Sequence, residues 1–242
     1  MNYYDDDEDL LKEKQAKDRA YLQIYEGMLC IKRSEQPEDP AFKRYESKSK
    51  NTKGKVSWKK ELEWVKEYMT RLRKRENEDK KENKKYFTAE ITFEKLNGKQ
   101  AIVSTPLKSE LVARLAKCAE NINFAMPLEL SAFRDSKTGR TRIILKQDDK
   151  NVEQKYTQEN PGKMPKWVKD EMTGEWDNKD YWAFLFGIIK DVVIPGCENT
   201  KAGIERHRQM EREHTNPVDE APDDLSEPED LDETNDADEI PS

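Results

Sequence analysis

The sequence predicts a mainly β fold with helical additions. Two stretches carry this prediction, residues 86–104 and 128–145, because each joins two runs of alternating apolar and polar residues through a turn signal. A third observation is the uneven charge, since acidic residues gather at both ends of the chain and basic residues lie between them. We therefore expect one folded, basic body with acidic ends.

The formal net charge of −7 over 242 residues hides this segregation. Residues 215–242 hold twelve acidic side chains and no Lys or Arg, and residues 1–11 hold five acidic side chains and no base. The part between them, residues 12–214, carries a net charge of +10. Its basic excess is greatest in residues 43–85, with seventeen basic against eight acidic side chains. This distribution favours a polyanionic partner.

Composition also excludes several classes of protein. No apolar run approaches the ~18 residues of a transmembrane helix, and the acidic N-terminal residues lack the apolar core of a secretory signal. Cys30, Cys118 and Cys197 are odd in number and far apart, which favours reduced thiols over disulfides or a zinc cluster. The chain has two histidines and no GxxxxGK[ST] motif. We expect a non-enzymatic cytoplasmic protein with no catalytic residues, metal or cofactor.

The predicted domain organisation follows the same shifts in composition. We expect a charged N-terminal segment at 1–19, a folded domain at 20–196, a charged helix or linker at 197–214 and a disordered acidic tail at 215–242. The tail has no aromatic residue and too little apolar surface to offset the entropy of ordering. Within the domain, residues of about 40–85 form an insertion, and 150–196 form an aromatic arm and an apolar element.

The first strand is expected at 21–32, where apolar residues change parity at Gly27, which indicates a bulge or sharp bend. Within the insertion, the spacing of apolar residues predicts a helix. Its apolar residues recur at steps of four and three, as on one face of an amphipathic helix: Trp58, Leu62, Val65, Met69 and Leu72. The prediction is a basic helical insertion after the first strand.

The second half of the chain supplies the remaining elements. Asn97-Gly98 joins the strands of a first hairpin, a helix follows at about 108–121, and a second hairpin covers 128–145. The helix has Leu111, Leu115 and Cys118 on one face. Residues 181–193 are the most apolar run, which fits a buried helix or strand or a self-association surface.

The resulting order is strand, basic insertion, hairpin, helix and hairpin. It resembles the OB-fold, a five-stranded barrel that binds oligonucleotides. The resemblance covers residues of about 20–147 and concerns topology. It implies a five-stranded OB-fold barrel that carries a basic helical insertion after strand 1 and a disordered acidic tail.

The end of the chain carries a second resemblance. It is similar to the acidic tip of bacterial single-stranded DNA-binding proteins, a run of Asp before Ile-Pro-Phe, and the matching residues are Asp236, Asp238, Glu239, Ile240 and Pro241. Ser242 stands where that family has Phe. The whole chain thus resembles a phage single-stranded DNA-binding protein. The resemblance implies protection of single strands in DNA replication and recombination in the bacterial cytoplasm, with a tail that competes with DNA and docks polymerase or helicase.

Sequence-independent binding of a single strand needs cations for phosphates and flat side chains for bases. Three groups offer both kinds of residue. The insertion contributes Lys59, Lys60, Trp64, Lys66, Tyr68 and Arg71. The second hairpin contributes Phe133, Arg134, Lys137, Arg140 and Arg142. The arm contributes Tyr156, Lys163, Lys166 and Trp167.

Other readings of the same residues stay open. The aromatic residues of the insertion would equally pack a helix onto the barrel, and the lysines would equally be solvated. Single-stranded RNA is an alternative ligand, and a homodimer is an alternative to a monomer. The main alternative function is a virion- or transcription-associated protein that uses an OB-like domain for protein contacts. A nuclease is a weaker third class.

Overall fold

The computed structural model describes residues 19–47, 53–79, 83–157, 159–169 and 176–215. The predicted tail and most of the predicted N-terminal segment lie outside these residues. The strands of the large sheet are β1 (Arg19–Tyr25), β2 (Met28–Arg33), β3 (Lys43–Glu46), β4 (Val56–Leu62), β5 (Trp64–Asp79), β6 (Lys84–Glu94), β7 (Gln100–Pro106), β8 (Leu128–Arg134), β9 (Thr141–Gln147) and β10 (Lys150–Asn151). The other elements are α2 (Glu110–Cys118), η1 (Ala119–Asn121), β11 (Val168–Lys169), β12 (Trp176–Asp177), α3 (Lys179–Ile188), η2 (Ile189–Val193) and α4 (Ile194–Thr215).

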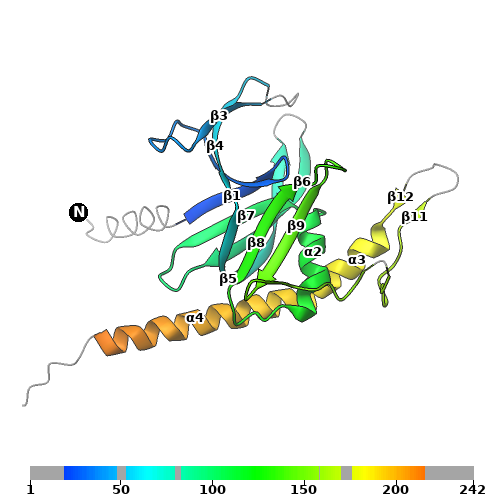
Figure 1. Ribbon diagram of the computed structural model, residues 1–242. Helices are drawn as coiled ribbons and strands as arrows, with labels where there is room; N and C mark the ends of the chain where they lie inside the picture. Colours follow the sequence, from blue (N-terminus) through cyan, green and yellow to red (C-terminus); the bar gives the residue numbers. More distant parts are fainter. Residues whose placement is uncertain (1–18, 48–52, 80–82, 158, 170–175, 216–242) are drawn as a thin grey trace, which may run out of the picture.

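Ten of these strands form one mixed sheet in the order β10-β9-β8-β5-β6-β7-β1-β2-β4-β3 (Figure 1). Neighbouring strands pair antiparallel except β1 and β7, which are parallel. The prediction of a mainly β chain with helical additions is therefore confirmed. The structure does not show a closed five-stranded barrel, because β7 pairs with β1 and the sheet ends at two edges, β3 and β10.

The predicted bent first strand is instead a tight hairpin of β1 and β2. Its two turn residues, Glu26 and Gly27, both have positive φ, at 49° and 86°. Two-residue turns with positive φ at both positions match the right-handed twist of the strands on either side. The turn brings Leu22 opposite Ile31. Cross-strand partners face the same side, so the change of apolar parity comes from the reversal of the chain and not from a bulge.

The prediction of a helical insertion is wrong. Residues 56–79 form β4 and β5, and the apolar spacing has another origin. Each step of four joins residues on one face of a strand, as from Val65 to Met69. The steps of three fall where the alternation is broken, at Glu63 between the strands and at a register shift between Met69 and Arg71 in β5. That shift keeps Leu72 on the buried side.

The two predicted hairpins and the predicted helix are confirmed. β6 and β7 flank the turn at Asn97-Gly98, where Gly98 has a φ of 91°. β8 and β9 form the second hairpin. α2 begins at Ser109, whose side chain accepts a hydrogen bond from the Val112 amide and so satisfies one free donor of the first turn.

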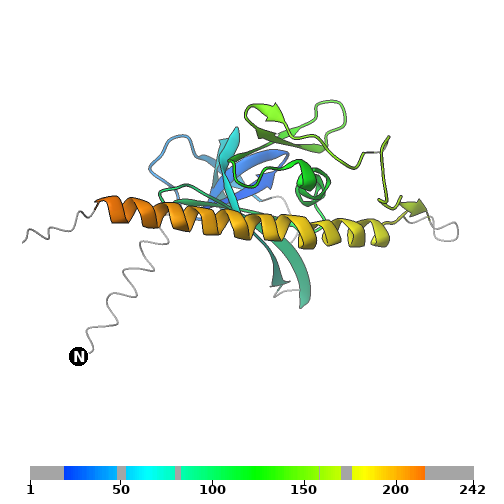
Figure 2. The same cartoon turned by 90° about the horizontal axis from the view of Figure 1, so that it is seen from below.

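One face of the sheet packs against the helices and forms the core. Buried residues of α2, α3 and η2 join buried strand residues in a single apolar cluster, which includes Trp182, Leu185 and Val193. α3, η2 and α4 run as one long rod across the molecule (Figure 2). η2 is a π-helical turn in which the Ile194 amide donates to Ile189. The wider turn is favoured there because Pro195 has no amide hydrogen and its ring crowds the preceding turn.

α4 is fixed at two points, one in the loop before β8 and one at the end of β6. Near its start, Gly196 lies against the ring of Phe124, and the Thr200 hydroxyl donates to the Phe124 carbonyl at 2.5 Å. Near its end, Arg208 forms an ion pair of 2.8 Å with the buried carboxylate of Glu94 and donates to the Leu96 carbonyl. These contacts hold the rod across the β6–β7 turn.

Two glycines of α4 test this packing. A methyl group at Gly196 would come within 2.5 Å of the Phe124 ring, whereas one at Gly203 would meet nothing within 4 Å. Gly203→Ala should raise the free energy of unfolding by about 0.5–1 kcal/mol, because Ala restricts the unfolded chain and favours helix. Gly196→Ala should lower it, because Phe124 must move. Urea denaturation of both variants measures the difference, and equal stabilisation by both would contradict the described contact.

Candidate nucleic-acid interface

The face of the sheet opposite the core carries alternate residues that are basic, aromatic or small and polar. On β5 the register puts Arg71, Arg73 and Arg75 on this face, opposite Thr92, Glu90 and Thr88 of β6. On β1 the same face carries Tyr21, Gln23 and Tyr25, while Leu22 between them is buried in the core. Two-residue periodicity thus separates a core face from a polar face in the same strands.

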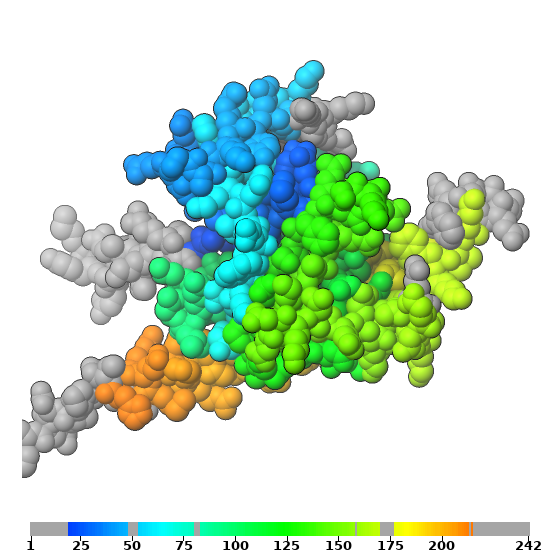
Figure 3. All heavy atoms as spheres, viewed as in Figure 1, coloured from blue at the N-terminus to red at the C-terminus, as the bar shows by residue number. Residues whose placement is uncertain are grey.

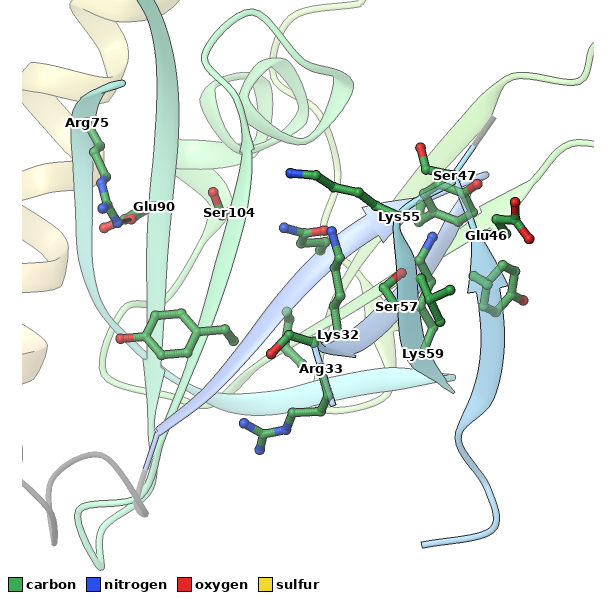
Figure 4. Close-up of a pocket in the computed structure, with 17 residues that line it drawn as sticks. Lys32, Arg33, Glu46, Ser47, Lys55, Ser57, Lys59, Arg75, Glu90 and Ser104 are labelled. Carbon is green, nitrogen blue, oxygen red and sulfur yellow. Dashed lines mark hydrogen bonds and ion pairs between the residues drawn. The ribbon is translucent and has the colours of Figure 1, made fainter. Parts of the chain in front are cut away.

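A cleft of about 720 Å³ lies on this polar face, and we call it the tyrosine cleft (Figure 4). Its lining includes Tyr21, Gln23, Tyr25, Lys32, Arg33, Tyr45, Glu46, Lys55, Ser57, Lys59, Arg75, Glu90 and Ser104. Lys55 directly precedes β4, and the other residues lie on seven strands, β1 to β7. Five basic side chains line the cleft against two carboxylates, so its field attracts anions.

Lys59 is the most unusual residue of the tyrosine cleft. Its side chain is buried, with 6% of the residue exposed, and its ammonium lies 2.7 Å from the ring centre of Tyr25 and 4.6 Å from that of Tyr45. The two rings meet edge to face at 5.9 Å. Burial lowers the pKa of Lys59. Within the described residues this ammonium has aromatic faces as its close partners and forms no ion pair, so cation–π attraction stabilises it.

At the other end of the cleft, the buried carboxylate of Glu90 binds two guanidinium groups, of which Figure 4 shows that of Arg75. Glu90 accepts hydrogen bonds of 2.7 Å from Arg73 and from Arg75. Burial raises the pKa of Glu90, but the hydrogen bonds from Arg75 and Arg73 outweigh it, and the net pKa is lowered. The pKa of Arg75 is raised, first by the hydrogen bond to Glu90 and to a smaller extent by the nearby hydroxyls of Tyr21 and Tyr86.

Two tyrosines keep their ring faces open to a ligand. Tyr21 is 52% exposed and Tyr86 is 51% exposed. Tyr21 lines the cleft together with Arg75, and Tyr86 is two residues from Thr88, the cross-strand partner of Arg75. An exposed aromatic ring beside a guanidinium is the combination that stacks a base and pairs with its phosphate. Tyr25 and Tyr45 differ, because Lys59 occupies the space over their rings.

The structure distributes the sequence-predicted residues over several surfaces. The tyrosine cleft contains Lys59, and Arg71 lies on the same face of the sheet. Lys60 is on the opposite face of β4 and pairs with Asp39 at 2.8 Å. Lys66 pairs with Asp149 at 3.2 Å.

The residues predicted in the second hairpin form a separate group with Trp64. Trp64 pairs with Ser131 of β8, and both Trp64 and Phe133 are exposed. Arg142 lies opposite Phe133 and pairs with Asp135 at 3.2 Å. Arg134, Lys137 and Arg140 are exposed at or beside the turn, and the backbone of Arg134 packs closely against Gly27.

The remaining predicted residues lie elsewhere. Tyr68 lines a second cavity of about 520 Å³ between β5 and α4. Tyr156 donates a hydrogen bond to Glu120 and packs edge-on against Phe184. Lys163 and Lys166 are exposed, and Trp167 is half exposed with its edge on Tyr181. The tail residues Asp236, Asp238, Glu239, Ile240 and Pro241 lie outside the described residues.

Most residues of the tyrosine cleft were not predicted from the sequence. The missed residues of the cleft are Tyr21, Gln23, Tyr25, Lys32, Arg33, Tyr45, Lys55 and Arg75. Arg73 and Tyr86, which lie beside the cleft on the same face of the sheet, were missed as well. The signal was present as alternation, in Tyr-Leu-Gln-Ile-Tyr at 21–25 and in Arg-Leu-Arg-Lys-Arg at 71–75. If both segments are strands, Tyr21 and Tyr25 share one face of the first, and Arg71, Arg73 and Arg75 share one face of the second.

The described residues contain neither a cluster of metal-ligating side chains nor a membrane-spanning helix. In these residues no group of three or more His, Cys, Asp or Glu side chains is arranged to hold a metal ion. No helix among them has the length and apolar content needed to cross a bilayer. Comparison with protein-family models, with curated protein sequences and with solved structures finds no match to the chain.

The Glu90 cluster predicts a pH dependence of stability. A carboxyl group with a lowered pKa stabilises the fold above its unfolded pKa of about 4.3, and this contribution is lost as the pH falls through the folded pKa. Glu90→Gln should therefore lower the free energy of unfolding by about 1–3 kcal/mol at pH 7. The difference from the wild type should shrink below about pH 4. Urea denaturation between pH 3 and 7 measures it, and a difference that is constant with pH would contradict the ion-pair description.

Proposed function

We propose that the chain binds single-stranded DNA without sequence preference and protects it in phage DNA replication or recombination. The observation that carries the proposal is the tyrosine cleft, where exposed aromatic rings alternate with basic side chains across one face of the sheet. Such a surface meets both needs of single-strand binding, since rings stack on bases and cations neutralise phosphates. No catalytic step is part of the proposal.

Three cations of the cleft are better placed to bind phosphate than Lys60 and Lys66 are. Lys32, Arg33 and Lys55 line the cleft and form no ion pair within the described residues. Lys60 and Lys66, which lie elsewhere, have carboxylate partners. A cation that already has a partner gains less from a phosphate, because the existing pair must first be broken.

An OB-type order of β5 to β9 is part of the proposal. The first part of β5 pairs with β8 and the rest pairs with β6, and α2 lies between β7 and β8. OB-folds bind oligonucleotides on the face of their second and third strands. In this order those strands are β6 and β7, which contribute Glu90 and Ser104 to the tyrosine cleft. β1 to β4 then extend the binding face beyond the five strands.

The biological setting of the proposal comes from the resemblance of the sequence to phage proteins. It comprises the bacterial cytoplasm, replication partners such as polymerase or helicase, and an acidic tail that competes with DNA for the basic cleft. The composition of residues 215–242 supports the competition, because twelve acidic side chains and no Lys or Arg make this segment a polyanion that a basic cleft attracts. Single-stranded RNA and a homodimer remain alternatives.

A second candidate function is a protein contact, and it rests on Trp64 and Phe133. Both are exposed on neighbouring strands, and the basic residues beside them, Lys66 and Arg142, are paired with carboxylates. Exposed aromatic residues with balanced charge are typical of protein interfaces. Figure 3 shows that β8 and β9 form an accessible face of the molecule. This surface is separate from the tyrosine cleft, so the two functions are testable independently.

The main test is a titration of labelled dT oligomers, duplex DNA and single-stranded RNA at two salt concentrations. The wild type should bind dT oligomers more tightly than duplex DNA. Tyr21→Ala and Tyr86→Ala should each weaken binding by about 1–3 kcal/mol, the contribution of one stacked base. Phe87→Ala is the matched control, because Phe87 is next to Tyr86 on the opposite face of β6. Equal loss in Tyr86→Ala and Phe87→Ala, or no binding by the wild type, would refute the proposal.

A second test concerns the phosphates. Lys32→Ala and Lys55→Ala should each make the slope of log K against log salt shallower by about 0.7, the value for one phosphate contact of a single strand. Lys66→Ala should leave the slope unchanged, since Lys66 lies outside the cleft and is paired with Asp149. If Lys66→Ala alone changes the slope, the binding surface is the one around Trp64 and Phe133.

A further inference from the structure

Gln23 lies in the middle of the tyrosine cleft. It is on β1 between Tyr21 and Tyr25, on the same face as both, and its cross-strand partners are Ser104 on β7 and Cys30 on β2. Its side chain is exposed and lines the cleft. Successive residues on one face of a strand are about 7 Å apart, so the amide is about equally far from the two tyrosines.

The chemistry of Gln23 differs from that of its neighbours. Gln23 is the one side-chain amide that lines the cleft, which is otherwise lined by basic, acidic, hydroxyl, aromatic and aliphatic residues in the described part of the chain. An amide offers one acceptor and two donors in a plane and carries no charge. Within the described residues the Gln23 amide makes no hydrogen bond to protein, so its donors and acceptor are available to a ligand.

A stacked single strand brings suitable groups to this position. Bases that stack on rings in a cleft present their edges to the side chains between the rings, and single strands are recognised through these edges. The nearby cations suit phosphates, whereas a neutral amide gains little from a phosphate. The donor and acceptor pattern of an amide matches base edges, which combine both kinds of group.

We propose that Gln23, with the Ser104 hydroxyl beside it, forms hydrogen bonds to base edges and so adds a base-dependent contribution to binding. This inference rests on the proposed function of the cleft. Rotation about the last side-chain bond exchanges the positions of the amide's donor and acceptor. Gln23 can therefore form hydrogen bonds to the edge of any of the four bases. Gln23 therefore distinguishes a strand that carries bases from a phosphate chain without them, and it leaves binding tolerant of sequence.

The test compares dT oligomers with oligomers of the same length built from N3-methylthymine. The added methyl group removes the N3–H donor of the base edge and leaves the two carbonyl acceptors, the ring face and the phosphates in place. Wild-type protein should bind dT about fivefold more tightly than the methylated oligomer, the effect of about one hydrogen bond. Gln23→Leu should bind both oligomers with the weaker affinity. Gln154→Leu is the matched control, since Gln154 lies outside the cleft, and it should keep the fivefold ratio.

The outcomes separate the inference from the proposed function. If wild-type protein binds neither oligomer, the proposed function fails. If wild-type protein binds both oligomers equally well, or if Gln23→Leu keeps the fivefold ratio, the inference is wrong and single-strand binding stands. The ratio of the wild-type affinities for the two oligomers is enough to support or overturn the inference. Thermal unfolding of Gln23→Leu shows whether that variant is folded.

Discussion

The structure depends on the register shift in β5. This strand is 16 residues long, and its two parts have different partners, β8 at the start and β6 over the rest. The shift between Met69 and Arg71 keeps apolar residues on the core side in both parts, since Met69 and Leu72 are buried although three residues separate them. The same shift turns Arg71, Arg73 and Arg75 toward the polar face. One local irregularity thus aligns both the core and the basic edge of the tyrosine cleft.

The sequence predicted the elements whose pattern is local. The β6–β7 and β8–β9 hairpins and α2 each combine an uninterrupted period with a turn or cap signal. The elements before β6 were assigned wrongly because their period is interrupted. The turn at Gly27 reverses a chain that looked like one strand, and the shift in β5 gives strand residues the spacing of a helix. The pairing of strands that are far apart in the chain, such as β1 with β7, has no local signal in the sequence.

The candidate site was predicted in part for the same reason. Lys59 and Arg71 were chosen because of a basic excess along the chain, and both lie on the polar face. Basic residues in sequence do not reveal their partners in space, so the carboxylates that pair with Lys60 and Lys66 were not foreseen. The tyrosines come from β1, β3 and β6, and the sheet alone brings them together. A binding face across neighbouring strands is a property of sheet order and register, which the sequence does not state.

Lys59 gives the strongest physical reason to regard the cleft as functional. Burying a cation without a carboxylate costs stability, and the faces of Tyr25 and Tyr45 offset this cost in part. An apolar residue at this position would avoid the cost, and the fold does not need the charge, because no described carboxylate pairs with it. A positive charge kept at such a position raises the potential of the cleft at all pH values where Lys is protonated. That potential suits the proposed polyanionic ligand, so a residue that is unfavourable for stability fits the proposed function of the cleft.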